Sequence, residues 1–449
     1  MEGRWTPLTN DMTTGRPLPL LVKFAIPLTL GNILQQLYNV ADSVIAGQFI
    51  GVDALAAIGS AGPLMFMVTG WLNGLTSGFA VLLSQSFGAG KKEELRRYAA
   101  LSVTISFVVT VVLTAILLAA NRTILGWMNV PQELMGQTWR YTEVIYGGLL
   151  ATCAYNALSA ALRALGDGKT PLYFLLLASV LNVALDIIFI VSFGMDVEGC
   201  AWATVIAQGL SVLLCMIRMV KDGGAATIHF KELRFNGSMI RQVITQGLPT
   251  GLQNSVISVG NLVVQSNINT FGAFAISGQG AFAKLEGIAF LPIMSMSMAL
   301  TTFVSQNLGA GKADRAKKGS VMGVAFGMAM AELVGICLFI WVPILLRIFV
   351  DVPEAIEFGT IHGRTVALFF FLLAFSNCAT GVLRGVGKSI VPMFTMLICW
   401  CGIRVLYVTI AIRIIPVFRT ISSAYPLTWT LSSIIFIVFL LRMDWDARV

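Results

Sequence analysis

The chain has 449 residues, of which 57% are hydrophobic and only 12% are charged, and its formal net charge is +8. Soluble domains are about a quarter charged, so this composition excludes a soluble globular protein and indicates a surface that faces lipid. His229 and His362 lie far apart near expected loops, so no histidine metal site or catalytic triad is predicted. The cysteines form no Cys-x-x-Cys pair, and we expect them to be packing residues.

Twelve apolar runs are long enough for membrane helices, because crossing a bilayer takes roughly 20 residues. In chain order they cover residues 20–48, 54–87, 98–120, 138–163, 170–193, 199–219, 240–270, 274–308, 319–346, 358–383, 389–413 and 420–441. Pro27, Pro249 and Pro292 fall inside runs and should bend their helices, with Pro27 as the hinge of the first. The segment before the first run has no apolar core with a cleavage site, so no cleavable signal peptide is expected.

Basic residues alternate between the loops. Most of the 30 Lys and Arg residues fall at the chain ends and in the even-numbered loops. The odd-numbered loops hold only Arg122, Arg140, Arg347, Arg364, Arg413 and Arg419. Because positive charge is retained on the cytoplasmic side, both termini are expected to be cytoplasmic.

The two halves of the chain resemble each other at an offset of about 221 residues. The run Ser84–Lys91 matches Ser305–Lys312, and Pro27 matches Pro249. Since six helices per half is an even number, both halves should have the same orientation, with a substrate cavity near their interface.

We therefore expect an all-α integral membrane protein of two pseudo-symmetric six-helix lobes. Its parts are a cytoplasmic segment 1–19, an N-lobe 20–220, a cytoplasmic linker 221–239, a C-lobe 240–441 and a cytoplasmic tail 442–449.

Ionisable residues inside the expected spans are candidates for function, because a charge in the membrane is costly. They are Asp42, Asp186, Lys284, Glu286, Glu332 and Arg404. The first half buries two acids and no base, whereas the second half holds two of each. Burial disfavours an ionised carboxylate, so we expect Asp42 and Asp186 to take up a proton or a sodium ion from outside. The alternative is that these acids only join helices through hydrogen bonds.

Several runs resemble the multidrug and toxic compound extrusion (MATE) family. They are Asn39–Gly47, Ala54–Gly59, the two Gly-Ala-Gly turns, Leu162–Pro171 and Asn182–Asp186. The resemblance covers nearly the whole chain and implies the twelve-helix MATE fold with cation-coupled efflux of drugs and metabolites.

The resemblance also implies site residues. Its DinF-like branch carries paired acids on helices one and five, which match Asp42 and Asp186. The cavity residues that carry over are Gln35, Tyr38, Asn39, Asn156, Asn182 and Thr204, with Tyr141 as a weaker match. A second, NorM-like branch uses acids on helices seven and ten, and this chain has none in the corresponding apolar stretches.

Polar residues also follow one face of the seventh expected helix. They include Asn254 and Asn261, which we interpret either as cavity lining or as helix-packing residues. Glu286 either pairs with a base near Lys284 or with Arg404, or contacts a cationic substrate. Glu332 is expected to be structural or to face the lumen.

These observations predict a secondary transporter, not an enzyme, in the bacterial inner membrane. It would export small organic molecules, often cations, in exchange for protons or sodium ions. We expect no cofactor and no nucleic-acid partner, contacts with membrane lipid, and a monomer. The alternatives are a lipid-linked oligosaccharide flippase of the same superfamily, which should line its cavity with Arg or Lys, a membrane-embedded enzyme, and a channel.

Overall fold

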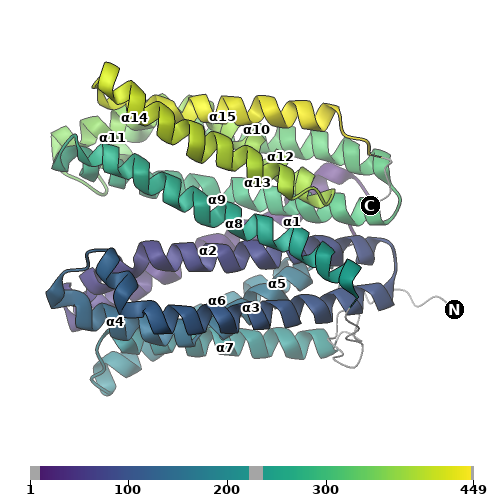
Figure 1. The fold of residues 1–449 in the computed structure, drawn as a ribbon, viewed down its shortest axis with the longest axis horizontal. Helices are drawn as coiled ribbons and strands as arrows, with labels where there is room; N and C mark the ends of the chain where they lie inside the picture. The colour runs from purple at the N-terminus through teal and green to yellow at the C-terminus, as the bar shows by residue number, and fades with distance from the viewer. Residues whose placement is uncertain (1–10, 222–235, 446–449) are drawn as a thin grey trace. The chain divides into compact units, whose positions relative to one another are not determined.

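The computed structural model describes residues 11–221 and 236–445, and within these ranges the chain forms helices and no strand (Figure 1). His229 and parts of the expected terminal and linker segments lie outside these ranges.

The described part of the first half, residues 11–221, contains seven helices and two π-helical turns. They are α1 (Pro17–Ile45), continued by η1 (Ala46–Ile50); α2 (Val52–Gly88); α3 (Lys92–Trp127); α4 (Gln132–Gly147); α5 (Leu149–Ala164); α6 (Lys169–Ile187), continued by η2 (Ile188–Ser192); and α7 (Val197–Lys221). Each expected run of this half therefore corresponds to a helix or a pair of helices.

The second half repeats the pattern with more interruptions. Its elements are α8 (Gly237–Asn269), α9 (Ala273–Gly309), α10 (Ala313–Leu346), α11 (Pro353–Val366), the 3-10 turn η4 (Ala367–Phe369), α12 (Phe370–Gly385), α13 (Ile390–Met396), the π-helical turn η5 (Leu397–Ile403), α14 (Arg404–Ile414) and α15 (Phe418–Leu441). The prolines Pro27, Pro249 and Pro292 lie inside α1, α8 and α9, as expected.

The number of helices fit to cross a membrane is close to the expected twelve. Among the described residues ten helical segments are long and apolar enough, and α4 with α5, bent by 46° at their junction, makes an eleventh. The remaining long helix is α8, which carries polar residues such as Gln246, Gln253 and Asn254 along its length. Its place as a twelfth span stays a prediction.

The close contacts divide the chain into two units. Unit 1 is built from Leu30–Gly251, and unit 2 joins Met12–Thr29 to the part of the chain from Leu252 onward. α1 is therefore shared, because its residues up to Thr29 belong to unit 2 and those from Leu30 belong to unit 1. The end of α8 before Leu252 likewise belongs to unit 1.

The internal repeat is visible in the backbone. Glycines with positive φ recur 221 residues apart, at Gly51 and Gly272 (134° and 91°), Gly90 and Gly311 (71° and 70°), and Gly166 and Gly387 (84° and 90°). A side-chain bond recurs at the same offset. The hydroxyl of Ser84 donates to the carbonyl of Ala164 at 3.3 Å, and that of Ser305 donates to the carbonyl of Gly385 at 3.1 Å. The two halves thus fold by the same local rules.

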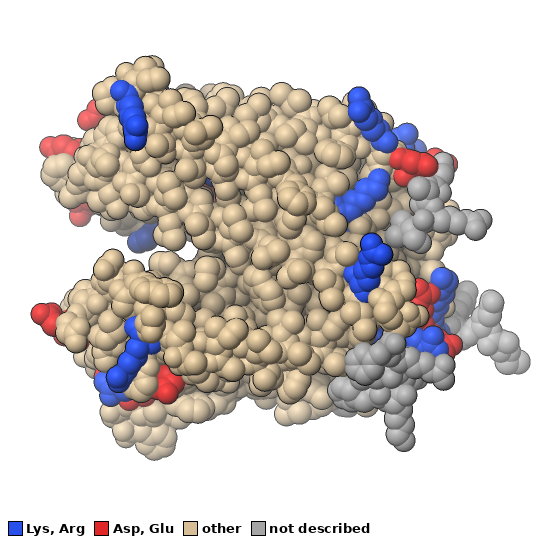
Figure 2. Space-filling view, viewed as in Figure 1, with Lys and Arg blue, Asp and Glu red and all other residues tan. Residues whose placement is uncertain are grey.

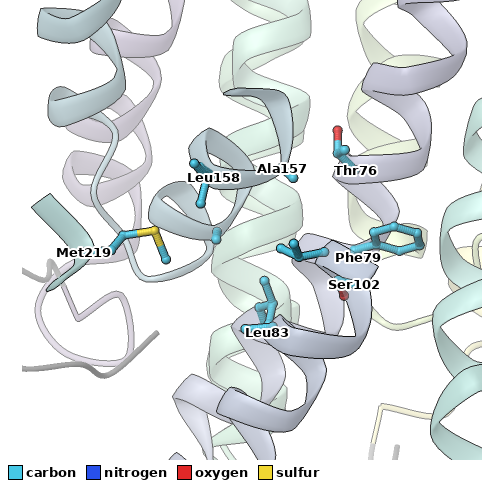
Figure 3. Close-up of a pocket in the computed structure, with 10 residues that line it drawn as sticks. Thr76, Phe79, Leu83, Ser102, Ala157, Leu158 and Met219 are labelled. Atoms are coloured by element: carbon cyan, nitrogen blue, oxygen red, sulfur yellow. The ribbon is translucent and has the colours of Figure 1, made fainter. Parts of the chain in front are cut away.

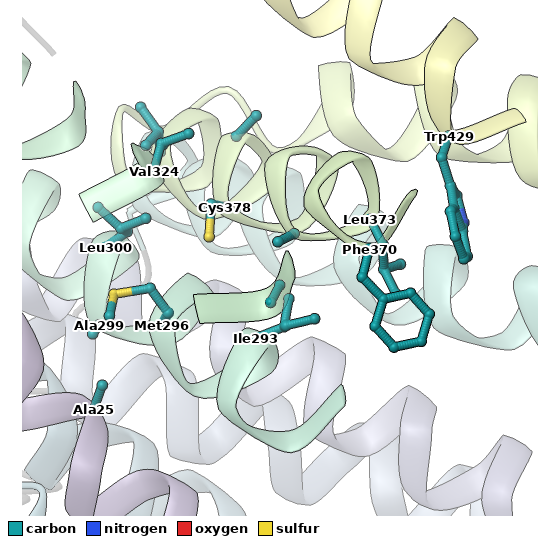
Figure 4. Packing of buried hydrophobic residues seen from close by; sticks show 14 of the residues in the cluster. Ala25, Ile293, Met296, Ala299, Leu300, Val324, Phe370, Leu373, Cys378 and Trp429 are labelled. Carbon is teal, nitrogen blue, oxygen red and sulfur yellow. The ribbon is translucent and has the colours of Figure 1, made fainter. Parts of the chain in front are cut away.

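Unit 2 has a large apolar core, to which the first part of α1 contributes. Figure 4 shows Ala25 of α1 next to Ala299 of α9, with Phe370 and Trp429 at the other end of the same cluster. Unit 1 has smaller cores. Between its helices lies a small apolar pocket lined by Thr76, Phe79, Leu83, Ser102, Ala157, Leu158 and Met219, among others (Figure 3).

Charged side chains gather at the helix ends. On the face shown in Figure 2, Lys, Arg, Asp and Glu lie at the two ends of the helices, and the band between them is nearly free of charge. A lipid hydrocarbon layer requires such a band, since it offers charged groups no hydration. The charge distribution therefore agrees with a membrane-spanning fold.

Candidate functional site

The two acids of the first half come together in unit 1. Asp42 lies in the last turn of α1 and Asp186 in the last turn of α6, and each is followed within a few residues by a π-helical turn. The turns η1 and η2 pack against each other, and π-helical turns in α-helices are frequent at functional sites. Nothing in the apolar runs Ala46–Ile50 and Ile188–Ser192 predicts this change of helix type.

Thr204 of α7 is the hub of the cluster. Its hydroxyl accepts from the hydroxyl of Tyr38 at 2.9 Å and from the amide of Asn182 at 3.5 Å, and it donates to Oδ2 of Asp42 at 3.4 Å. Helices α1, α6 and α7 are thus linked through one side chain. The Tyr38, Asn182 and Thr204 positions implied by the resemblance lie at one place.

Asp186 is buried and Asp42 is half-buried, and neither acid has a counter-charge among the described residues. Asn182 and Asp186 are 0% exposed. Among the described residues, both oxygens of Asp186 and Oδ1 of Asp42 are buried without a hydrogen-bond partner. The two carboxylates act electrostatically on each other and on Tyr38 and Tyr141, and no described Lys or Arg acts on either.

This arrangement is suited to holding a small cation. Two ionised carboxylates close together in a low-dielectric setting repel each other and lose their hydration. A proton shared with one acid, or a metal cation between them, removes that cost. The hydroxyl and amide groups of Tyr38, Thr204 and Asn182 supply further ligands or donors for either ion.

The other residues implied for this half are less closely engaged. Tyr141 is half-buried and packs with Ile45, Ala46 and Cys200 around the cluster. Gln35 and Asn156 are half-buried, whereas Asn39 is exposed. Tyr38, one turn before Asp42, joins the cluster, whereas the carbonyl of Asn39 accepts from the hydroxyl of Ser43 at 2.9 Å.

An ion-pair group that the sequence pattern missed lies beside Tyr141. Arg140 pairs with Asp196 at 2.9 Å and with Glu198 at 3.7 Å, and Gln137 donates to Asp196 at 3.0 Å. These contacts join α4 to the segment that starts α7. Arg140 was expected in a loop, but α4 begins at Gln132 and therefore includes it. The ion pairs thus link α4 to the start of α7.

Unit 2 holds its own buried charges, in a different arrangement. Arg404 is 2% exposed, and its guanidinium lies over the rings of Tyr425 and Trp400, 4.4 and 5.4 Å from their centroids. Its Nη2 donates to Thr428 at 2.9 Å. Glu286 interacts electrostatically with Arg404. Of the bases proposed for Glu286, the structure thus brings Arg404 near it, and Lys284 is exposed with its ammonium over the Phe349 ring.

His362 was expected near a loop, at the start of the run 358–383, but it lies in the protein interior. It lies inside α11 and is 0% exposed. Its ring nitrogens meet Gln279 at 3.3 Å and Ser422 at 2.9 Å, and Phe282 packs edge-on against its ring. The expected boundary at residue 358 had placed His362 near a helix end, because the first turn of α11 is polar and was not counted.

Glu332 has a structural role. Its carboxylate accepts the backbone N–H of Phe371 at 3.2 Å, where η4 interrupts the path from α11 to α12. A helix start leaves N–H groups unpaired, so this acid satisfies one of them inside the apolar span.

The polar side chains of α8 mostly bond within their own helix. Thr250 donates to Gln246 and Ser258 donates to Asn254, each to the carbonyl at 3.0 Å, and Gln265 donates to Asn269 at 3.0 Å. Asn254 is half-buried and Asn261 is exposed. Whether these residues line a cavity stays a prediction.

Comparison with known proteins gives one consistent family. The family model described as MatE matches residues 27–188 and 249–410, once in each half. The chain is 27% identical over 394 residues to the probable multidrug resistance protein YpnP of Bacillus subtilis, covering 88% of both chains. It is 28% identical to the probable multidrug resistance protein NorM of Thermotoga maritima, covering 85% of this chain and 82% of the relative. A protein named FAD transporter from Shewanella oneidensis is 24% identical and covers 81% and 79%.

Solved structures agree at the level of the fold. A MATE crystal structure described as the bent conformation superposes with a TM-score of 0.90 at 20% identity and covers 96% of both chains. One described as the straight conformation has a TM-score of 0.90 at 20% identity and covers 98% of both chains. The expected fold class is thereby confirmed.

Proposed function

The chain belongs to the MatE family of multidrug efflux transporters, and on that premise we propose that it is an antiporter. It exports small organic molecules, often cations, and takes in protons or sodium ions. The coupling ion binds at Asp42 and Asp186. The proposed site of action is the bacterial inner membrane, with both termini in the cytoplasm and a monomer as the working unit.

The observation that carries this proposal is the buried acid pair without a base. A structural pair would be expected to have a cationic partner, because an uncompensated buried charge is strongly destabilising. Among the described residues the groups acting on the two carboxylates are neutral or acidic. A transported cation that binds between the two carboxylates would offset their charge, which explains how both acids can lie in an apolar span.

The energy available to such an exchange is sufficient for export. One charge that crosses a potential of 100 mV releases about 2.3 kcal/mol. Since every 1.4 kcal/mol or so is a tenfold change in an equilibrium, one ion sustains roughly a 50-fold gradient of a neutral substrate. Each unit of pH difference adds about one further factor of ten.

α1 connects the ion site to the rest of the protein. Asp42 lies near its outer end, and Pro27 lies 15 positions earlier, where the helix lacks a backbone hydrogen bond. MATE crystal structures similar in fold to this chain are described in a bent and in a straight conformation. From the position of Pro27 between the start of α1 and Asp42, we expect cation binding at Asp42 to change the path of α1 at Pro27 and so to alternate access.

Everted membrane vesicles test the coupling. With a proton or a sodium gradient imposed separately, the wild-type protein should accumulate a fluorescent organic cation in response to one of them. Asp42→Asn and Asp186→Asn should abolish this accumulation while expression and thermal stability stay the same. Asp53→Asn, which changes an exposed carboxylate at the start of α2, is the matched control and should transport normally. Normal export by both buried variants would refute the proposal.

A flippase for lipid-linked sugars is the alternative within the same superfamily. A pyrophosphate group should be held by Arg or Lys, and the acid cluster of unit 1 contains neither. Arg404 is a buried base of unit 2, and it is already engaged by Thr428 and two rings. Vesicles loaded with an organic cation and with a lipid-linked sugar decide between the two, and transport of only the sugar would favour the flippase.

A further inference from the structure

The residues that precede α1 are held by side chains from a single corner of unit 2. Met12 is 1% exposed and belongs to the apolar core of that unit. Its N–H donates to Oε1 of Gln306 at 3.1 Å, and its carbonyl accepts from Nδ2 of Asn307 at 3.1 Å. Gln306 and Asn307 are 0% exposed and lie at the end of α9, so the chain is pinned from the protein interior.

Two cationic side chains also bind this segment, Arg315 from α10 and Lys312 from the turn before α10. Nζ of Lys312 donates to the carbonyl of Thr13 at 2.9 Å. Arg315 donates from Nη1 to the carbonyl of Gly15 at 2.6 Å, and from Nη2 to the carbonyls of Thr14 at 2.8 Å and Met12 at 3.1 Å. Hydrogen bonds from a charged donor are stronger than neutral ones. Every carbonyl from Met12 to Gly15 is therefore bound by a side chain.

These contacts account for a motif that the ion site leaves unexplained. Three of the four residues that bind Met12–Gly15 lie within the repeated run Ser305–Lys312. They are Gln306, Asn307 and Lys312. The tight turn itself needs only Gly311, whose φ is +70°. The turn does not need the two fully buried amide side chains of Gln306 and Asn307. These side chains instead bind the main chain of Met12, 294 and 295 positions away.

The grip fixes one end of the helix that carries Asp42. Residues up to Thr29, including Pro27, belong to unit 2, and α1 passes into unit 1 at Leu30. Ala25 belongs to the same buried core of unit 2 as Ala299 (Figure 4). A bend of α1 at Pro27 moves the rest of the protein only if the start of α1 is fixed. If the start were free, it would move in place of the rest of the protein.

We propose that Gln306, Asn307, Lys312 and Arg315 form a clamp on Met12–Gly15 that couples ion binding in unit 1 to the movement of unit 2. This inference rests on the proposed antiport. The four residues are positioning residues, since none touches Asp42 or Asp186. Releasing the clamp leaves the ion site intact but lets α1 respond to the ion without driving export.

The coupling ratio is the property that tests the clamp. In proteoliposomes with a pH indicator or a sodium indicator inside, substrate moved per coupling ion is measured for the wild-type protein and for Arg315→Ala and Gln306→Ala. We expect this ratio to fall about tenfold, because the loss of a charged hydrogen bond shifts a docking equilibrium by about that factor. We also expect the coupling ion to leak inward in the absence of substrate. A purely structural role would lower transport and leak together and keep the ratio unchanged, which would overturn the proposal.

Lys317→Ala is the matched control. Lys317 is exposed on α10, two positions beyond Arg315, so its removal changes the net charge by the same amount without touching Met12–Gly15. It should keep the wild-type ratio, and Arg315→Lys should restore part of it. If Lys317→Ala lowers the ratio as much as Arg315→Ala, surface charge is responsible and the clamp is refuted.

Docking of the segment is measured without transport. In a full-length protein with its own cysteines replaced, Met12→Cys should react slowly with a maleimide because the position is buried. Adding Arg315→Ala should speed the reaction about tenfold. Equal rates would overturn the clamp. If the wild-type protein shows no ion-coupled export, the antiport proposal fails, and the labelling rates still decide whether the segment is clamped.

Discussion

At the scale of single residues, one hydroxyl connects three helices of unit 1. Thr204 was implied only by family resemblance, yet it contacts Tyr38, Asn182 and Asp42 at 2.9 to 3.5 Å. A hydroxyl both donates and accepts, so it can rotate as a proton arrives on Asp42. Neither Ala nor Val offers this double function.

Replacing Thr204 should therefore affect transport more than stability. Interhelical hydrogen bonds in membranes contribute only about 0.6 kcal/mol on average, so Thr204→Val should change the thermal unfolding temperature little. It leaves Tyr38 and Asn182 without their acceptor, and we expect ion-driven export to fall at least about tenfold. Thr204→Ser keeps the hydroxyl and should restore most of the rate. Equal transport by the Val and Ser variants would exclude a role for the hydroxyl.

At the scale of elements, α1 has Pro27 in its interior and is followed at its end by the π-helical turn η1. Proline in a helix interior removes one backbone hydrogen bond. The other prolines inside helices include Pro63, Pro343 and Pro426, but none lies in a helix shared by the two units and carrying an acid. Pro27 is therefore the position at which α1 can change direction.

Pro27→Ala tests this function of α1. The substitution restores the missing N–H and favours a straight helix, so thermal stability should be equal or higher while ion-driven export falls. Pro343→Ala in α10 is the control, and its export rate should stay close to the wild-type value. Dye efflux from vesicles and thermal unfolding in detergent measure the two properties. Full export by Pro27→Ala would show that the helix needs no hinge.

At the scale of the whole molecule, the alternation of basic loops predicts the orientation in the membrane. The structure agrees with charged ends and a nearly uncharged band (Figure 2), but either end could face the cytoplasm. The Lys91–Arg97 and Lys312–Lys318 corners, both rich in Lys and Arg, should lie inside.

Reporter fusions measure this orientation. A fluorescent protein fused after Val449 should fluoresce, because both termini are expected in the cytoplasm. Alkaline phosphatase fused after Asn129, between α3 and α4, should be active outside. Activity of the phosphatase after Val449 would reverse the assignment and would place the clamp on the outer side.

Much of the architecture could be predicted from the sequence, because it depends on the length of apolar runs and on the spacing of the repeat along the chain. Apolar runs of sufficient length must be helical in lipid, so each expected span corresponds to one helix or to consecutive helical segments, with ends displaced by a few residues. The 221-residue offset predicted paired corners, and Gly90 and Gly311 have nearly the same φ. The sequence also showed that the expected spans of the first half contain two acids and no base, and no described Lys or Arg acts on Asp42 or Asp186.

Only the tertiary structure decided which polar groups meet. The resemblance implied both Tyr38 and Asn39, but only Tyr38 joins the cluster among the described contacts, since the position of α7 determines which side of α1 faces Thr204. The burial of His362 and the clamp on Met12–Gly15 depend on residues tens to hundreds of positions apart. Hydropathy and periodicity describe one helix at a time, whereas these contacts arise from how helices pack.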